Sequence, residues 1–141
     1  MDSKKQKIIE LARSLIGTPY KYAVKPEEAP KYLDCSSFTQ YIYKQIGIEI
    51  PRSTLLQAAQ AGKEIRLSDK PETGDLLFFR GHKGHYDDEL FPGREIYIGH
   101  VAIYSGNNKA IHGNFKMGIV EEILDKIIKE KGLMVMIKRI L

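Results

Sequence analysis

The sequence predicts an α+β fold in which N-terminal helices pack on a central antiparallel sheet. Two observations support this class. Apolar residues recur at helical spacing before residue 62, and short strand-like apolar runs separated by turn residues follow it. Helices first and strands afterwards are typical of α+β proteins. The 141 residues contain no internal repeat, low-complexity tract or flexible linker, so we expect one domain spanning residues 1–141.

A first helix is predicted from apolar residues three and four positions apart, namely Ile8, Ile9, Leu11, Ala12, Leu15 and Ile16. Gly17 followed by Pro19 ends it, because glycine terminates helices and proline cannot continue them. Residues 18–33 contain three prolines and no clean period, which indicates an irregular surface segment.

A second helix is predicted to begin at Asp34-Cys35-Ser36, with Asp34 as its N-cap, and to run to Gly47. Its apolar residues Phe38, Ile42 and Ile46 fall on one face. Ser53 or Thr54 can cap a short third helix that runs to Gly62.

The second half of the chain is predicted to form the sheet. Residues 76–79 read Leu-Leu-Phe-Phe and form a buried strand after a turn at 71–74. Residues 101–104 and 110–112 form a hairpin around Gly106-Asn107-Asn108. Residues 133–141 form a final strand, and residues 80–98 are a long connection within the sheet.

Composition and charge exclude several classes of protein. The net charge of +4 is compatible with anionic cell-wall polymers, with nucleic acid or with no particular partner. No recognised nucleic-acid motif is present, so nucleic acid is not expected as a partner. No apolar run reaches the ~20 residues that a membrane-spanning helix needs, so no membrane span is expected. The polar N-terminus shows no secretory signal, which predicts a cytoplasmic location, with secretion or delivery by a phage as alternatives. The sequence indicates no oligomeric state.

The single cysteine has an unusual position. One cysteine excludes an intrachain disulfide and a thiolate-rich metal site. A lone cysteine is most often a buried structural residue, but Cys35 lies between Asp34 and Ser36 at a predicted helix start. The free N–H groups and the dipole there favour negative charge and lower the pKa of a thiol. Cys35 is therefore a candidate nucleophile.

Two histidines supply the partners that a nucleophilic thiol needs. His100 begins one strand of the predicted hairpin and His112 lies in the other, so the turn brings them close to opposite each other. A thiol requires a base within hydrogen-bond reach, and that base requires an orienting group. The alternative is that one or both are hydrogen-bonded core or surface histidines.

Six segments, in this order, resemble the NlpC/P60 cell-wall peptidases. They are Gly17-Thr18-Pro19-Tyr20, Asp34-Cys35-Ser36-Ser37-Phe38, Ile50-Pro51-Arg52-Ser53-Thr54, Gly74-Asp75-Leu76-Leu77-Phe78-Phe79, Gly99-His100-Val101-Ala102-Ile103-Tyr104 and Ala110-Ile111-His112. The sequence departs from the family at Ser37, where glycine is frequent, and at Lys21-Tyr22-Ala23, where Trp-Gly-Gly is common. The 80–98 connection is also longer than expected.

This resemblance implies a papain-like fold and a cysteine peptidase that hydrolyses peptidoglycan stem peptides. The usual bond joins the γ-carboxyl of D-glutamate to a diamino acid. By position, Cys35 is the nucleophile, His100 the general base and acid, and His112 the orienting residue. Tyr20 matches the aromatic residue beside the nucleophile and is expected to support the oxyanion. Substrate amine and carboxylate groups are expected to bind Asp34, Ser36 and Arg52.

The long connection contains a possible metal motif, His82-Lys83-Gly84-His85 followed by Asp87, Asp88 and Glu89. Histidine and carboxylates bind zinc, but this spacing fits no zinc motif, and a polar exposed loop is the simpler interpretation. We therefore expect neither a metal nor another cofactor.

Two other functions stay open. One is a thiol amidase or acyltransferase on the same fold, because the fold and the nucleophile do not determine the acyl donor. The other is a non-catalytic wall-associated or phage-associated module that kept the papain-like core.

Overall fold

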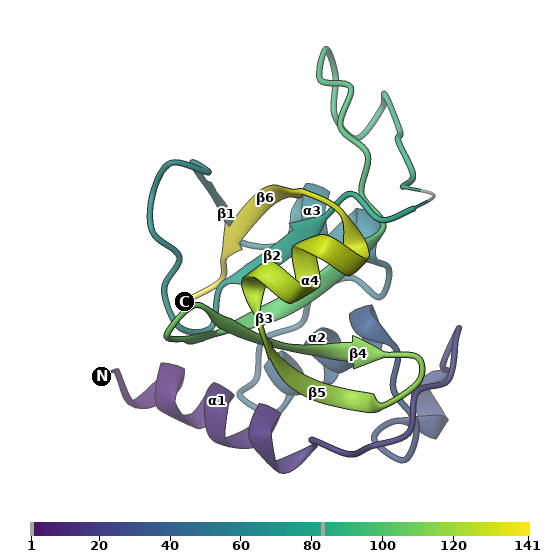
Figure 1. Cartoon of the computed structure of the whole chain (residues 1–141), viewed down its shortest axis with the longest axis vertical. Coiled ribbons are helices and arrows are strands. Elements are labelled where there is room, and N and C mark those ends of the chain that lie inside the picture. Colours follow the sequence, from purple (N-terminus) through teal and green to yellow (C-terminus); the bar gives the residue numbers. More distant parts are fainter. Residues whose placement is uncertain (1, 83) are drawn as a thin grey trace.

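The computed structural model describes residues 2–82 and 84–141. It contains a six-stranded antiparallel sheet in the order β1-β6-β2-β3-β4-β5, with helices on both faces (Figure 1). The strands are β1 (Lys63–Ile65), β2 (Leu76–Phe79), β3 (His100–Gly106), β4 (Lys109–Asn114), β5 (Gly118–Ile123) and β6 (Met134–Arg139). The helices are α1 (Ser3–Ser14), the 3₁₀ turn η1 (Pro26–Glu28), α2 (Cys35–Lys44), α3 (Thr54–Gln60) and α4 (Leu124–Lys131). The predicted α+β class is confirmed.

The sheet separates two apolar cores. The larger core joins α1 and α2 to one face of the sheet through residues that include Ile8, Phe38, Phe78, Ile103 and Ile111. The smaller core places α4 on the other face, through residues that include Leu77, Phe79, Ala102, Leu124 and Ile127. Because both faces are covered, all four residues of β2 are buried, which explains its continuous apolar sequence.

The β3–β4 hairpin carries the two histidines and forms where the sequence predicts it. Gly106, Asn107 and Asn108 all have positive φ, at 98°, 52° and 59°. Glycine and asparagine are the residues that adopt this left-handed conformation most readily. The turn chemistry therefore determines where the hairpin reverses.

Two strands and one helix were not predicted. They are β1, β5 and α4, and the last two form a continuous unit from Gly118 to Lys131. The 80–98 connection extends beyond the sheet (Figure 1), although Phe91 and Ile98 within it are buried in the larger core. Among the described residues, no helix is both long enough and apolar enough to cross a bilayer.

Candidate active site

Cys35 is the first residue of α2, and the local sequence places it there. Asp34 caps the helix, since its side chain accepts a hydrogen bond from the Ser37 backbone N–H at 2.7 Å. The Ser37 hydroxyl in turn accepts from the Asp34 N–H at 2.8 Å. This reciprocal capping satisfies N–H groups at the start of the helix and holds the Cys35 backbone in place.

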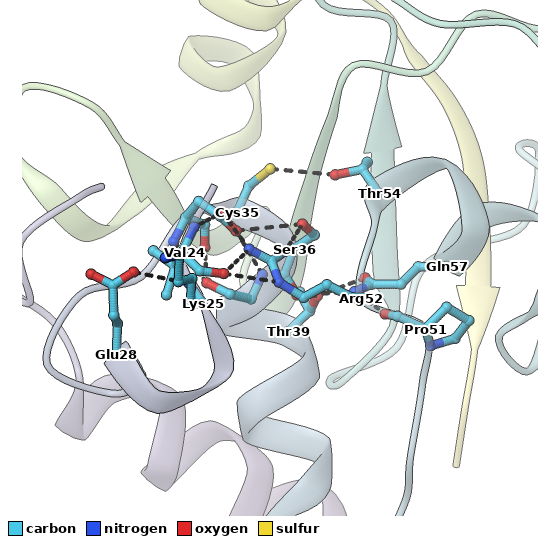
Figure 2. A network of polar contacts seen from close by, with 12 residues as sticks. Val24, Lys25, Glu28, Cys35, Ser36, Thr39, Pro51, Arg52, Thr54 and Gln57 are labelled. Carbon is cyan, nitrogen blue, oxygen red and sulfur yellow. Dashed lines mark hydrogen bonds and ion pairs between the residues drawn. The ribbon is translucent and has the colours of Figure 1, made fainter. Parts of the chain in front are cut away.

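Cys35 is half-buried, with its Sγ 3.5 Å from the Thr54 Oγ1 at the start of α3 (Figure 2). Burial raises the pKa of the thiol, and the negative charge of Asp34 acts in the same direction, whereas the Thr54 hydroxyl lowers it. The net shift is upward, so the expected lowering by the helix start is wrong. Desolvation is the largest cause of this upward shift, and the adjacent carboxylate adds to it.

His100 and His112 contact each other directly. His100 Nε2 lies 2.8 Å from His112 Nδ1, and both side chains are buried. Ile103 pairs with Ile111, so the two histidines are diagonal neighbours across the ladder rather than directly opposed. Their rings meet edge to face at 85°. This geometry allows one imidazole to orient the other.

Burial lowers the pKa of both imidazoles. The pKa of His100 falls well below its usual value of 6.5, because desolvation is reinforced by His112 and by the Lys131 ammonium. The pKa of His112 is also lowered by burial, although contact with Glu122 opposes this shift. Both imidazoles are therefore neutral near pH 7.

Glu122 on β5 extends this chain of contacts and was not predicted from the sequence. Its Oε1 lies 2.8 Å from His112 Nε2, and its Oε2 lies 2.5 Å from Lys126 Nζ. The four-residue spacing of Glu122 and Lys126 is the only local signal, and it is typical of a helical ion pair. Glu122 instead lies on a strand, and the pairing of β5 with β4 brings it to His112.

A cavity of about 570 Å³ brings most of the predicted residues together. The predicted site residues that line it are Tyr20, Asp34, Cys35, Ser36, Arg52 and His100. His112 does not line the cavity and lies buried behind His100. Because Cys35 comes from α2 and His100 from β3, the cavity is formed between the helical and sheet halves of the chain.

Arg52 joins Asp34, Ser36 and Val24 in a polar network, and Figure 2 shows its contacts with Ser36 and Val24. Arg52 donates to the Asp34 carboxylate and to the Val24 carbonyl, each at 2.7 Å, and to the Ser36 hydroxyl at 2.8 Å. Burial raises the pKa of Asp34, but the hydrogen bonds from Arg52 and Ser37 lower it by more, so the net shift is downward. The network fixes the residue 24 segment against the start of α2.

Tyr20 lies beside the nucleophile and packs against Gly113 of β4. A Cβ at Gly113 would lie only 3.1 Å from the Tyr20 ring, so a larger residue there would have to displace the ring by a few tenths of an ångström. Burial, together with the charges of Cys35 and Asp34, raises the pKa of Tyr20 to about 12. The hydroxyl therefore stays protonated at neutral pH and can donate a hydrogen bond.

The base of the 80–98 connection also reaches this cavity. His82 and His85 line it together with Lys131 from the end of α4. Lys83, the central residue of the possible metal motif, lies outside the described residues. In the two described ranges, no three His, Cys, Asp or Glu side chains gather where they could hold a metal ion.

Comparisons with known proteins agree with this architecture. The sequence model of the NlpC/P60 family matches residues 17–137. The chain is 35% identical over 123 residues to a probable endopeptidase of Corynebacterium glutamicum, which covers 85% of this chain and 48% of that protein. It is 37% identical over 92 residues to the Escherichia coli murein DD-endopeptidase MepS/murein LD-carboxypeptidase, covering 64% and 40%.

Solved structures show the same fold. The NlpC/p60 domain of the peptidoglycan hydrolase SagA matches with a TM-score of 0.72 and 28% identity, covering 96% of this chain and 97% of that chain. An NlpC/P60 family protein from Bacillus cereus matches with a TM-score of 0.77 and 27% identity, covering 97% and 40%. The chain spans about half the length, or less, of these two curated relatives.

Proposed function

The chain belongs to the NlpC/P60 family, and we propose from this premise that it is a cysteine peptidase acting on peptidoglycan stem peptides. The bond that we assign is the one between the γ-carboxyl of D-glutamate and a diamino acid. The observation that most directly supports a cysteine peptidase is a cavity lined both by the Cys35 thiol at the start of α2 and by an imidazole. That imidazole, His100, is held in turn by His112 at 2.8 Å.

The proposed reaction starts from a neutral thiol and a neutral imidazole. His100 takes the thiol proton of Cys35 as the sulfur attacks the carbonyl carbon of the substrate. The Cys35 backbone N–H and the Tyr20 hydroxyl stabilise the oxyanion that forms. His100 then gives its proton to the leaving amine of the diamino acid, and a thioester on Cys35 remains.

Water completes the proposed cycle. His100, again neutral, takes a proton from the water molecule that attacks the thioester carbonyl. As the second tetrahedral intermediate collapses, His100 returns its proton to the Cys35 sulfur. The product leaves as a carboxylic acid, which loses its own proton to the solvent and becomes a carboxylate. The same residues therefore serve both halves of the reaction, as paired acid–base groups do.

The proposed substrate contacts use the charged residues of the cavity. Arg52 is our candidate for the α-carboxylate of D-glutamate, because its side chain is 34% exposed and its fork can bind a carboxylate in a bidentate manner. Asp34 is our candidate for a free stem amine, and Ser36 for a further hydrogen bond. Arg52 and Asp34 already form an ion pair with each other, so the substrate groups would bind to side chains that keep this pairing.

Mass analysis of digested muropeptides tests this function. The wild-type protein should convert L-Ala-γ-D-Glu-diamino acid into L-Ala-D-Glu and the free diamino acid, and Cys35→Ala should form neither product. Cleavage of a D,D peptide bond instead, as the name murein DD-endopeptidase of the E. coli relative describes, would show that the assigned bond is wrong. Peptide transfer to an added amine in place of hydrolysis would favour the acyltransferase. An inert wild-type protein would favour the non-catalytic module.

A further inference from the structure

The buried side of the site contains an acidic residue to which the proposed reaction assigns no role. Glu122 follows His112 in a continuous chain of contacts from the cavity to α4, formed by His100, His112, Glu122 and Lys126. The three contacts measure 2.8, 2.8 and 2.5 Å. His100, His112 and Glu122 are all buried, so water does not compete for these bonds.

The direction of each hydrogen bond in this chain follows from Glu122. Burial raises the pKa of Glu122, but its contacts with Lys126 and His112 lower it by more, so it is a carboxylate at neutral pH. A carboxylate only accepts hydrogen bonds, so His112 Nε2 must carry a proton and donate it. Neutral His112 then has a bare Nδ1, which accepts from His100 Nε2–H.

The consequence appears at the other nitrogen of His100. Neutral His100 with a proton on Nε2 has an unprotonated Nδ1. That atom has no hydrogen-bond partner within residues 2–82 and 84–141, and none of the fully buried side-chain nitrogens there lacks one. Nδ1 therefore retains access to the cavity that Cys35 also lines.

We propose that Glu122 is a positioning residue that sets the tautomers of both imidazoles, so that the bare Nδ1 of His100 faces the cavity as the base. The catalytic role of these tautomers rests on the proposed function, whereas the tautomers themselves do not depend on it. The opposite tautomers would place an N–H of His100 toward the cavity, where it could not accept a proton. Lys126 contributes by keeping Glu122 ionised, and Lys131 and Glu130 of α4 are the other charged groups that act on His112.

Long-range ¹H–¹⁵N spectra of the full-length protein with labelled histidine test this directly. In the wild type near pH 7.5, both His100 and His112 should show the Nε2–H tautomer. An Nδ1–H tautomer at either residue would overturn the proposal. The wild-type spectrum needs neither a variant nor a substrate, so it decides the matter even if the assigned peptide is not hydrolysed. Correct tautomers in an inert protein would refute the proposed function alone.

Two variants with a matched control test the role of the carboxylate. Glu122→Met removes the acceptor at similar length, whereas Glu122→Gln keeps an oxygen that can accept from His112. The fraction of Nε2–H tautomer and kcat should both fall in the order wild type, Gln, Met, with KM nearly unchanged. For the Met variant we expect kcat to fall by about a hundredfold, less than the ~10⁴-fold seen when a directly orienting carboxylate is neutralised.

The control is Glu121→Met, one residue earlier on β5. Glu121 contacts Arg13 and Ser105 and takes no part in the histidine chain. This variant should keep wild-type tautomers and kcat. If Glu122→Met is folded and matches the Glu121→Met control in both measurements, Glu122 does not position the imidazoles.

Discussion

The resting protein holds Cys35 as a thiol and His100 as a neutral imidazole, since burial raises the pKa of the first and lowers that of the second. Under the proposed function, the thiolate is therefore formed by proton transfer during the reaction. His100 has to be unprotonated at the start to accept that proton, which gives a specific pH dependence.

We expect kcat/KM to stay constant as the pH falls from 7.5 to 6.5. An ordinary imidazole would be half protonated at 6.5, but the pKa of His100 lies well below that value. Activity should fall only as the pH passes through this lowered pKa, because kcat/KM reports the free enzyme. Initial rates on a defined peptide measure this. A midpoint near 6.5 would contradict the buried neutral base.

The two histidines should respond differently to substitution. His100 transfers the proton, so His100→Ala should lose activity about as completely as Cys35→Ala, because groups that act as a unit fail together. His112 only orients, so His112→Gln or His112→Asn should retain more activity than His112→Ala. Steady-state kinetics with each variant would show the difference. Equal loss in all three His112 variants would exclude an orienting role.

At the scale of secondary-structure elements, the start of α2 determines where the nucleophile lies. Asp34→Ala should lower the free energy of unfolding by about 1–2 kcal/mol through loss of the cap alone, with a further loss because Arg52 is left without its carboxylate. Activity should fall as well, since Cys35 follows the cap. Urea unfolding and peptide hydrolysis are the two measurements.

Asp2→Ala is the matched control, because Asp2 caps α1 through the Lys4 N–H at 2.8 Å, away from the cavity. This variant should lower the free energy of unfolding but leave the activity per folded molecule unchanged. Wild-type activity in folded Asp34→Ala would show that the cap does not position the thiol.

The helices and the hairpin that the sequence predicts are those defined by signals within the segment itself. The first three helices carry caps and apolar periodicity, and the β3–β4 turn carries residues suited to positive φ, so sequence reasoning found them. The β5 strand and α4 were missed because they are short and rich in charge, and only packing against β4 and the second core defines them. Glu122 was missed for the same reason.

In the site as well, local motifs predict some properties of the residues, and the packing of distant segments determines the others. The positions of Cys35 and the two histidines follow from motifs, but their protonation depends on burial, which a motif does not encode. The mutual pairing of Asp34 and Arg52 likewise depends on how α2 meets the segment before α3. The sequence therefore indicates which residues gather but not the charges they carry.

For the whole molecule, the cavity between the helical and sheet halves has an excess of positive charge. Its described lining contains the cations Lys131 and Arg52 and a single carboxylate, that of Asp34. Arg52 pairs with Asp34, whereas Lys131 forms no ion pair with another described residue. This balance favours substrates with several carboxylates. We expect KM to rise when the α-carboxylate of D-glutamate is replaced by an amide, and to rise with salt for the acidic peptide.

Lys131→Gln should raise KM for the acidic peptide and affect the amide peptide less. Lys129→Gln is the matched control, because Lys129 is exposed on the same helix and does not line the cavity. Michaelis–Menten kinetics on both peptides with both variants give the comparison. Equal effects of the two lysine variants would show that cavity charge does not select the substrate.

The single cysteine of this chain allows a direct titration of the thiol that we propose carries out the hydrolysis. The protein is treated with increasing iodoacetamide, and both the alkylated fraction and the rate of peptide hydrolysis are measured on each sample. Because every alkylated cysteine is Cys35, the rate should fall in proportion to the alkylated fraction and reach zero at one group per chain. Fully alkylated, folded protein that still hydrolyses the peptide would show that Cys35 is not the nucleophile.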